Sequence, residues 1–236
     1  MNTQTPSPDL LDSRLSELAA TRAGASRVFA RHRLDFCCHG NVTVAEACVK
    51  AGLDAADLIA ELRAEERVAT DFRSWVTEPL TGVIDHVLTR FHEPLRQELP
   101  RLVRMAERVE AVHGHRDDAP GGLGAHLTEM TTELELHMQK EERILFPLVR
   151  DGHGGAALAP IRMMEQEHED LAGQLARTRS LTGDMVPPDD ACGTWRALYA
   201  GLIDLELDLM EHVHLENAVL FPRALGRPVA AASASS

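Results

Sequence analysis

The sequence is poor in aromatic residues and in positive charge. Trp, Tyr and Phe together make up 4% of its 236 residues, whereas Leu, Ala, Glu and Arg are frequent, and this composition favours helices over sheets. Acidic residues outnumber basic ones by 37 to 24, so the formal net charge is −13. Sequence-independent binding of nucleic acid needs Lys and Arg for the phosphates. We therefore expect no nucleic-acid partner.

Long apolar runs and a disulfide pattern are also lacking. No stretch approaches the roughly 20 apolar residues of a membrane span, and residues 1–11 have neither the basic start nor the apolar middle of a secretory signal. The four cysteines at positions 37, 38, 48 and 192 do not form the pattern of a secreted disulfide framework. These absences predict a cytoplasmic protein that acts without a membrane.

What the sequence does contain is one motif written twice. Residues 137–147 read HMQKEERILFP, and residues 212–222 read HVHLENAVLFP. Each copy places a His four residues before a Glu, and such positions are neighbours on one face of an α-helix. A shorter motif recurs upstream of each copy, as His-Glu-Pro-Leu at 92–95 and His-Glu-Asp-Leu at 168–171. The order of these motifs along the chain, His, His-x-x-x-Glu, His, His-x-x-x-Glu, predicts a duplicated pair of helices.

Four long segments carry apolar residues at spacings of three and four, which predicts core-facing helices. They cover about 79–112, 123–149, 156–182 and 190–222. Short loops between them predict a four-helix bundle. Within each apolar stripe stand His or Glu side chains, so we expect them in the core rather than on the solvent face. These six residues are His92, His137, Glu141, His168, His212 and Glu216.

The fold class predicted is therefore all-α, with a small helical N-terminal domain before the bundle. The spacing of Thr43 and Glu46 is that of a capping box, and it predicts a short helix that ends near Gly52. Pro94 and Pro100 predict a kink or local irregularity in the first long segment. We divide the chain into a small domain at 1–65, a linker at 66–78, the bundle at 79–226 and a disordered tail at 227–236.

Two glutamates and four neutral imidazoles in one core require a partner, because a buried carboxylate without one is costly. No Lys or Arg shares these stripes. Imidazole and carboxylate suit iron, manganese or zinc, while the lack of a thiolate there disfavours a structural zinc site. Two carboxylates can bridge two ions, so we predict a non-haem di-metal centre, with iron as the first choice. The competing interpretation is that each His-x-x-x-Glu is only a solvated ion pair.

Cys37 and Cys38 are a separate signal. Adjacent cysteines form disulfides only with strain, and such bonds are easily reduced. The pair could act in redox exchange, in metal or nitrosyl handling, or in docking onto a damaged cluster. It could also be one buried cysteine beside an exposed one.

The motifs together resemble those of the Repair of Iron Centers family of di-iron proteins, and segments 79–226 resemble hemerythrin-like domains. The resemblance rests on DFCCHG, ELPRL, HMQKEERILFP, EQEHED, PPDDACGTWRALY and LENAVLFPRAL, which in this order span about residues 11–226. It implies two iron ions in an oxo-bridged pair, held by the four histidines, with Glu141 and Glu216 bridging. His39 stands where relatives of this family carry Gly.

The resemblance also implies a function: repair of iron–sulfur clusters damaged by nitric oxide or oxidants, through donation of iron, with Cys37 and Cys38 assisting. The expected partners are damaged iron–sulfur proteins, with nitric oxide or O2 as small ligands, and a homodimer is left open. Oxygen-carrying hemerythrins have five His and close with His-x-x-x-x-Asp, whereas this chain closes with His212-x-x-x-Glu216. The alternatives are a nitric oxide reductase or scavenger at the di-iron pair and a hemerythrin-like sensor of O2 or nitric oxide.

Overall fold

The computed structural model describes residues 8–68 and 75–229, which form helices and no strand. The all-α prediction is therefore confirmed. None of the helices in these two ranges combines the length and the apolar character of a membrane span. The chain divides into two units, of which the first joins Met1–Val83 with Met210–Ser236 and the second is Ile84–Leu209. Both divisions fall inside continuous helices, so the units share α6 (Leu80–His86) and α11 (Gly193–Leu215).

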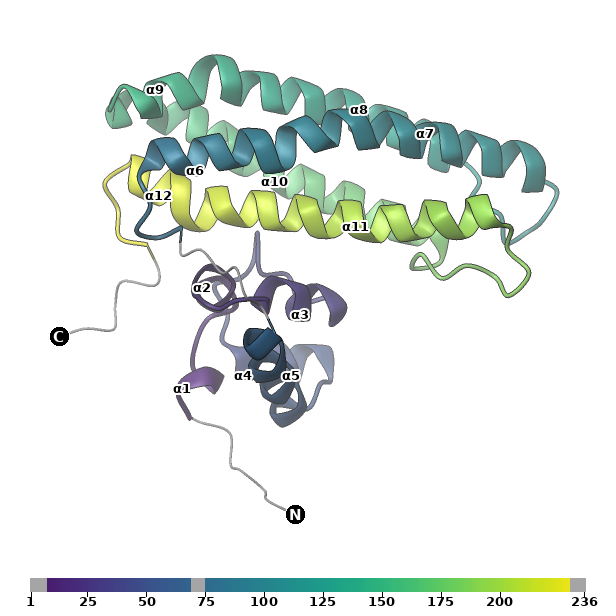
Figure 1. The fold of residues 1–236 in the computed structure, drawn as a ribbon, viewed down its shortest axis with the longest axis horizontal. Helices are drawn as coiled ribbons and strands as arrows, with labels where there is room; N and C mark the ends of the chain where they lie inside the picture. The colour runs from purple at the N-terminus through teal and green to yellow at the C-terminus, as the bar shows by residue number, and fades with distance from the viewer. Residues whose placement is uncertain (1–7, 69–74, 230–236) are drawn as a thin grey trace. The chain divides into compact units, whose positions relative to one another are not determined.

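The second unit contains the four long rods of a helical bundle (Figure 1). All four follow the predicted segments with ends that differ by a few residues, and the fourth is α11 with its C-terminal continuation. The first rod is α6 continued by η1 (Val87–His92) and α7 (Glu93–His113), the second is α8 (Leu123–Lys140) with η2 (Glu141–Leu145) and α9 (Phe146–Arg150), and the third is α10 (Gly154–Thr182). Apolar side chains such as Leu102 and Leu127 are fully buried between them. The predicted four-helix bundle is confirmed.

In the first unit, the described residues at 8–68 form five short helices, and a C-terminal part of the chain packs with them. The five are α1 (Pro8–Leu11), α2 (Leu15–Thr21), α3 (Ala25–Arg31), α4 (Val44–Ala51) and α5 (Ala55–Val68). Its C-terminal part continues α11 with η3 (Glu216–Leu220) and α12 (Phe221–Ala224). Phe29 and Phe36 are fully buried at the centre of this unit, and Met210 of α11 packs against the same core.

Local sequence signals explain how the short helices begin and end. Thr43 and Glu46 form the predicted capping box, in which each side chain accepts a hydrogen bond from the other residue's backbone N–H. The helix ends at Gly52, whose φ of 68° is left-handed and therefore suits glycine. Asp54 then caps α5, because its carboxylate accepts the backbone N–H of Ala56 at 2.7 Å.

Part of the predicted domain scheme falls beyond the described residues. Residues 69–74 of the linker predicted at 66–78 lie outside them, as do residues 230–236 of the tail predicted at 227–236. The limits of the four predicted regions stay a prediction.

Candidate metal centre

All six predicted residues are helical and buried, with exposed fractions between 0% and 6%. Each of the four rods supplies at least one of them. His92 ends η1, Glu141 and Glu216 begin η2 and η3, and the remaining three lie in α-helices. Those three are His137 in α8, His168 in α10 and His212 in α11. The placement agrees with the prediction that these polar side chains interrupt the core stripes.

Three of the six residues belong to π-helical turns, and a proline follows each turn. A proline has no N–H to donate to the carbonyl four residues earlier. In each case the residue just before the proline donates instead to the carbonyl five residues back, from Glu93 to Leu88, from Phe146 to Glu141 and from Phe221 to Glu216. Such π-turns are frequent at functional sites. The irregularity predicted near Pro94 is thus a π-turn that ends at His92, whereas α7 continues through Pro100.

The structure brings the six residues together as two overlapping groups. One group is His92, Glu141, His212 and Glu216, and the other is His137, Glu141, His168 and Glu216. Within each group one ligand atom per residue lies within 4.8 Å of all the others. The two glutamates are shared, so each group pairs two imidazoles with the same two carboxylates. This is an arrangement that could hold two ions with bridging carboxylates.

Glu141 shows why a cation fits this group. Its carboxylate is fully buried, and neither oxygen has a hydrogen-bond donor among the residues described. Nε2 of His92 lies 3.3 Å from its Oε2, and Nε2 of His137 lies 3.6 Å from its Oε1. A buried charge in this situation needs a counter-charge, since desolvation is expensive. The donors are nitrogen and carboxylate oxygen, which suit iron, manganese or zinc.

A second layer of carboxylates orients two of the imidazoles. Nδ1 of His92 lies 2.8 Å from Oε1 of Glu142, and Nδ1 of His137 lies 2.9 Å from Oε2 of Glu167. A carboxylate at Nδ1 favours the proton on that nitrogen and leaves the lone pair of Nε2 for a metal. In both rings Nε2 is the nitrogen that faces Glu141.

Basic residues keep these outer carboxylates charged. Burial raises the pKa of Glu142, but hydrogen bonds from Arg96 and His92 outweigh it, and the net pKa is lowered. Burial likewise raises the pKa of Glu167, and bonds from Lys140 and His137 lower it overall. Sequence reasoning missed both glutamates. Glu142 directly follows the predicted ligand Glu141, and Glu167 directly precedes the predicted ligand His168. Their position next to ligands in the sequence was a usable signal, but an unspecific one.

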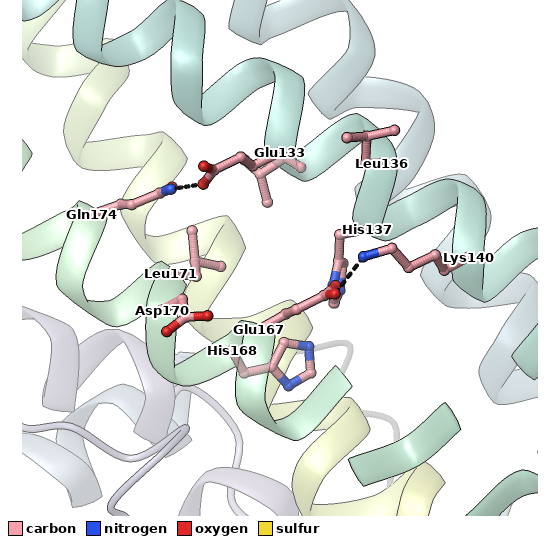
Figure 2. Close-up of a pocket in the computed structure, with 10 residues that line it drawn as sticks. Glu133, Leu136, His137, Lys140, Glu167, His168, Asp170, Leu171 and Gln174 are labelled. Carbon is pink, nitrogen blue, oxygen red and sulfur yellow. Dashed lines mark hydrogen bonds and ion pairs between the residues drawn. The ribbon is translucent and has the colours of Figure 1, made fainter. Parts of the chain in front are cut away.

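A cavity of about 400 Å³ lies between α8 and α10 and reaches two of the predicted ligands (Figure 2). Figure 2 shows His137 and His168 together on its lower side, with Lys140 paired to Glu167 beside them. At its other end Gln174 donates to Glu133. The cavity is large enough for water or a small molecule next to the imidazoles.

The loop between α3 and α4 carries the two predicted cysteines, both half-buried and both free thiols. Their sulfurs are 3.7 Å apart, and Sγ of Cys37 lies 3.4 Å from Oδ1 of Asp35. The hydrogen bond with the Cys38 thiol, followed by burial and the nearby negative charge of Asp35, raises the pKa of the Cys37 thiol. The donor atoms of this loop form a group of their own, separate from the His and Glu donors of the bundle.

Hydrogen bonds join the same loop to the segment that carries Glu216. His214 is buried, and its Nδ1 lies 3.3 Å from the carbonyl oxygen of Phe36, which accepts the hydrogen bond. Nδ2 of Asn217 donates to the carbonyl of Cys37 at 3.3 Å. The burial of His214 comes from packing within the first unit, where its ring lies edge-on to that of Phe36 with 5.5 Å between the ring centroids.

Comparisons with known proteins cover nearly the whole chain. The profile of the hemerythrin HHE cation binding domain matches residues 83–224, and that of ScdA_N, a domain of unknown function, matches residues 11–66. An iron-sulfur cluster repair protein YtfE from Pectobacterium carotovorum is 46% identical over 214 residues, which are 91% of this chain and 97% of the relative. One from Yersinia pseudotuberculosis is 45% identical over 217 residues, 92% and 98% of the two chains.

The fold and the buried donors are those of a hemerythrin-like bundle that could bind metal. At this identity and coverage, the chain belongs to the same family as the YtfE proteins, with an N-terminal ScdA_N domain before the HHE domain. The resemblance to the Repair of Iron Centers family is thereby confirmed.

Proposed function

We propose that this protein repairs iron–sulfur clusters damaged by nitrosative or oxidative stress, and that it does so by donating iron from a di-iron centre. The observation that carries the proposal is the buried set of four imidazoles around Glu141 and Glu216, in a chain whose relatives are named for cluster repair. In this proposal His92 and His212 would hold one ion, His137 and His168 the other, and both glutamates would bridge. The bound iron would be the cargo that a damaged cluster receives.

The chain's own residues then have three tasks. Glu142 and Glu167 orient His92 and His137 through Nδ1, which keeps Nε2 available. The bundle core excludes bulk water from Glu141, so the charge of the site must be balanced by the ions it holds. Four imidazoles for two ions leave coordination positions open, and an open site exchanges its metal more readily than a closed one.

The test is a repair assay in a defined mixture. The full chain is loaded with iron and desalted, then added to an iron–sulfur enzyme that nitric oxide has inactivated. We expect recovery of the enzyme's activity in proportion to the iron supplied. His137→Ala should abolish the recovery, whereas the exposed His153→Ala should retain it. No recovery, together with steady release of nitrous oxide when an electron donor is present, would instead favour the nitric oxide reductase.

The cytoplasm is the compartment we propose. All four cysteines are free thiols, and a reducing compartment keeps thiols in that state. Damaged iron–sulfur proteins are the proposed partners, and nitric oxide or O2 the proposed small ligands. A homodimer is a further proposal that sedimentation of the iron-loaded chain would test.

A further inference from the structure

The loop at residues 35–39 gathers several metal-binding side chains outside the bundle centre. Asp35, Cys37 and Cys38 each offer one ligand atom, and these three atoms lie within 4.8 Å of one another. All three residues are half-buried, so the group is sheltered but reachable. Two thiols and a carboxylate in one short loop form a set of donors quite unlike the imidazoles of the bundle.

The distance between the two sulfurs is informative. A disulfide needs an S–S separation of about 2.0 Å, and the observed 3.7 Å is far longer. Two thiolates about 2.3 Å from one tetrahedral ion would lie about 3.8 Å apart, and a thiolate and a carboxylate oxygen about 3.6 Å apart. The observed values are 3.7 Å between the sulfurs and 3.4 Å from Cys37 to Asp35. The thiols are therefore spaced for one shared ion.

Asp35 is held in place from several directions. Its Oδ1 accepts the backbone N–H groups of Cys37, Cys38 and His39 at 3.0 to 3.3 Å. Its Oδ2 lies 2.7 Å from Nδ1 of His39. An outer imidazole that contacts a ligating carboxylate orients that ligand. His39 therefore holds the Asp35 carboxylate in its orientation.

The loop is also fixed from outside. A Cβ at Gly40 would lie 2.3 Å from the carbonyl oxygen of Phe36, so the tight turn has no space for a side chain there. The carbonyls of Phe36 and Cys37 accept hydrogen bonds from His214 and Asn217. A loop fixed in this way pays little conformational entropy when its donors close on an ion.

We propose that Asp35, Cys37 and Cys38 form a second metal site for one thiophilic divalent cation, such as Fe2+, Zn2+ or Co2+, with His39 positioning Asp35. Two sulfur donors select this class over Mg2+ or Ca2+. Binding exchanges the two thiol protons for the ion, so two protons are released to water for each divalent ion bound. Three protein ligands leave one position open. The inference does not rest on the proposed repair function, because it concerns this loop alone.

The test is a titration of the reduced, metal-free full chain with Co2+. Thiolate-to-cobalt charge-transfer absorption reports cysteine ligands only, so cobalt in the bundle group does not contribute to it. We expect this band to saturate at the intensity of one thiolate-bound Co2+ per chain, whatever further Co2+ the bundle takes up, and to disappear when Zn2+ is added. Cys37→Ser and Cys38→Ser should each remove most of the band, and Cys192→Ser, which changes another half-buried thiol, should leave it intact.

A second variant separates a site from a mere fold requirement. His39 is exposed, with 67% of its side chain accessible, so His39→Ala should fold normally, as circular dichroism would show. We expect it to weaken Co2+ binding by roughly 10- to 100-fold. A wild-type chain without a thiolate band, or a band that survives in both Cys37→Ser and Cys38→Ser, would overturn the proposal. A His39→Ala affinity equal to wild type would overturn the role given to His39.

Discussion

The side-chain amide of Asn217 donates a hydrogen bond to the backbone carbonyl of Cys37 at 3.3 Å, and Asn217 directly follows Glu216 in the chain. His214, two residues before Glu216, bonds the neighbouring carbonyl of Phe36. The cysteine loop is therefore attached on both sides of a predicted metal ligand. The cysteine loop and Glu216 belong to separate motifs in the sequence, but these two hydrogen bonds join their segments within the first unit.

Removal of this attachment should cost stability. Asn217→Ala leaves the Cys37 carbonyl without that donor, and we expect the free energy of unfolding to fall by about 1 kcal/mol. Urea denaturation followed by circular dichroism measures it. Gln166→Ala is the matched control, because its amide lies on an exposed face at 3.5 Å from Asp170, and its effect should stay below about 0.5 kcal/mol. Equal losses in the two variants would contradict the structural role of Asn217.

Neutralising Glu141 should change stability and metal binding in opposite directions. In metal-free protein, Glu141→Gln removes a buried charge without a hydrogen-bond donor, so the free energy of unfolding should rise by about 1–2 kcal/mol. Iron content after reconstitution should fall sharply, because an amide is a poor bridging ligand. Unfolding of the apo forms and iron analysis give the two values. Glu129→Gln, on the exposed face of α8, should alter neither, and a destabilised apo Glu141→Gln would show that the carboxylate is already compensated.

The outer carboxylates should tune metal affinity without being ligands. Glu167→Gln weakens the orientation of His137, and we expect metal affinity to fall by roughly 10- to 100-fold while the stoichiometry is kept. Competition with a chelator of known affinity measures the change. Glu165→Gln, an exposed position on the same helix, serves as the control. Loss of a whole metal equivalent in Glu167→Gln would mean that this residue is itself a ligand.

His126 should make the bundle sensitive to acid. It is buried in α8, with Nε2 at 2.9 Å from Oγ1 of Thr178, and burial lowers its pKa from the ordinary value of an imidazole. As the pH falls below the ordinary imidazole pKa of about 6.5, the unfolded chain takes up a proton that folded His126 resists, so this residue's contribution to stability is lost.

The measurement is urea unfolding at pH 7.5 and at pH 5. His126→Gln should lose less stability between these two values than the wild type does. His115→Gln, an exposed change in a loop, should match the wild type. An unchanged difference in His126→Gln would show that other groups set the acid response.

Much of the architecture was predictable because helical periodicity is local. The apolar spacing located the four long segments to within a few residues, and the capping box at Thr43 and Glu46 marked α4. The i,i+4 spacing of His137 and Glu141 and of His212 and Glu216 selected the pairs that the folded chain brings together. Their assignment as ligands, and the number of ions, stay predictions.

The sequence by itself therefore determined which helices form and which of their faces carry His and Glu, since both follow from residue spacing along one helix. Only the tertiary structure decided the placement of Glu142 and Glu167 on the outer nitrogens of His92 and His137, and the burial of His214. Those features depend on side chains from distant segments and on how neighbouring helices fill the space around them. Residue spacing within one segment carries no information about either.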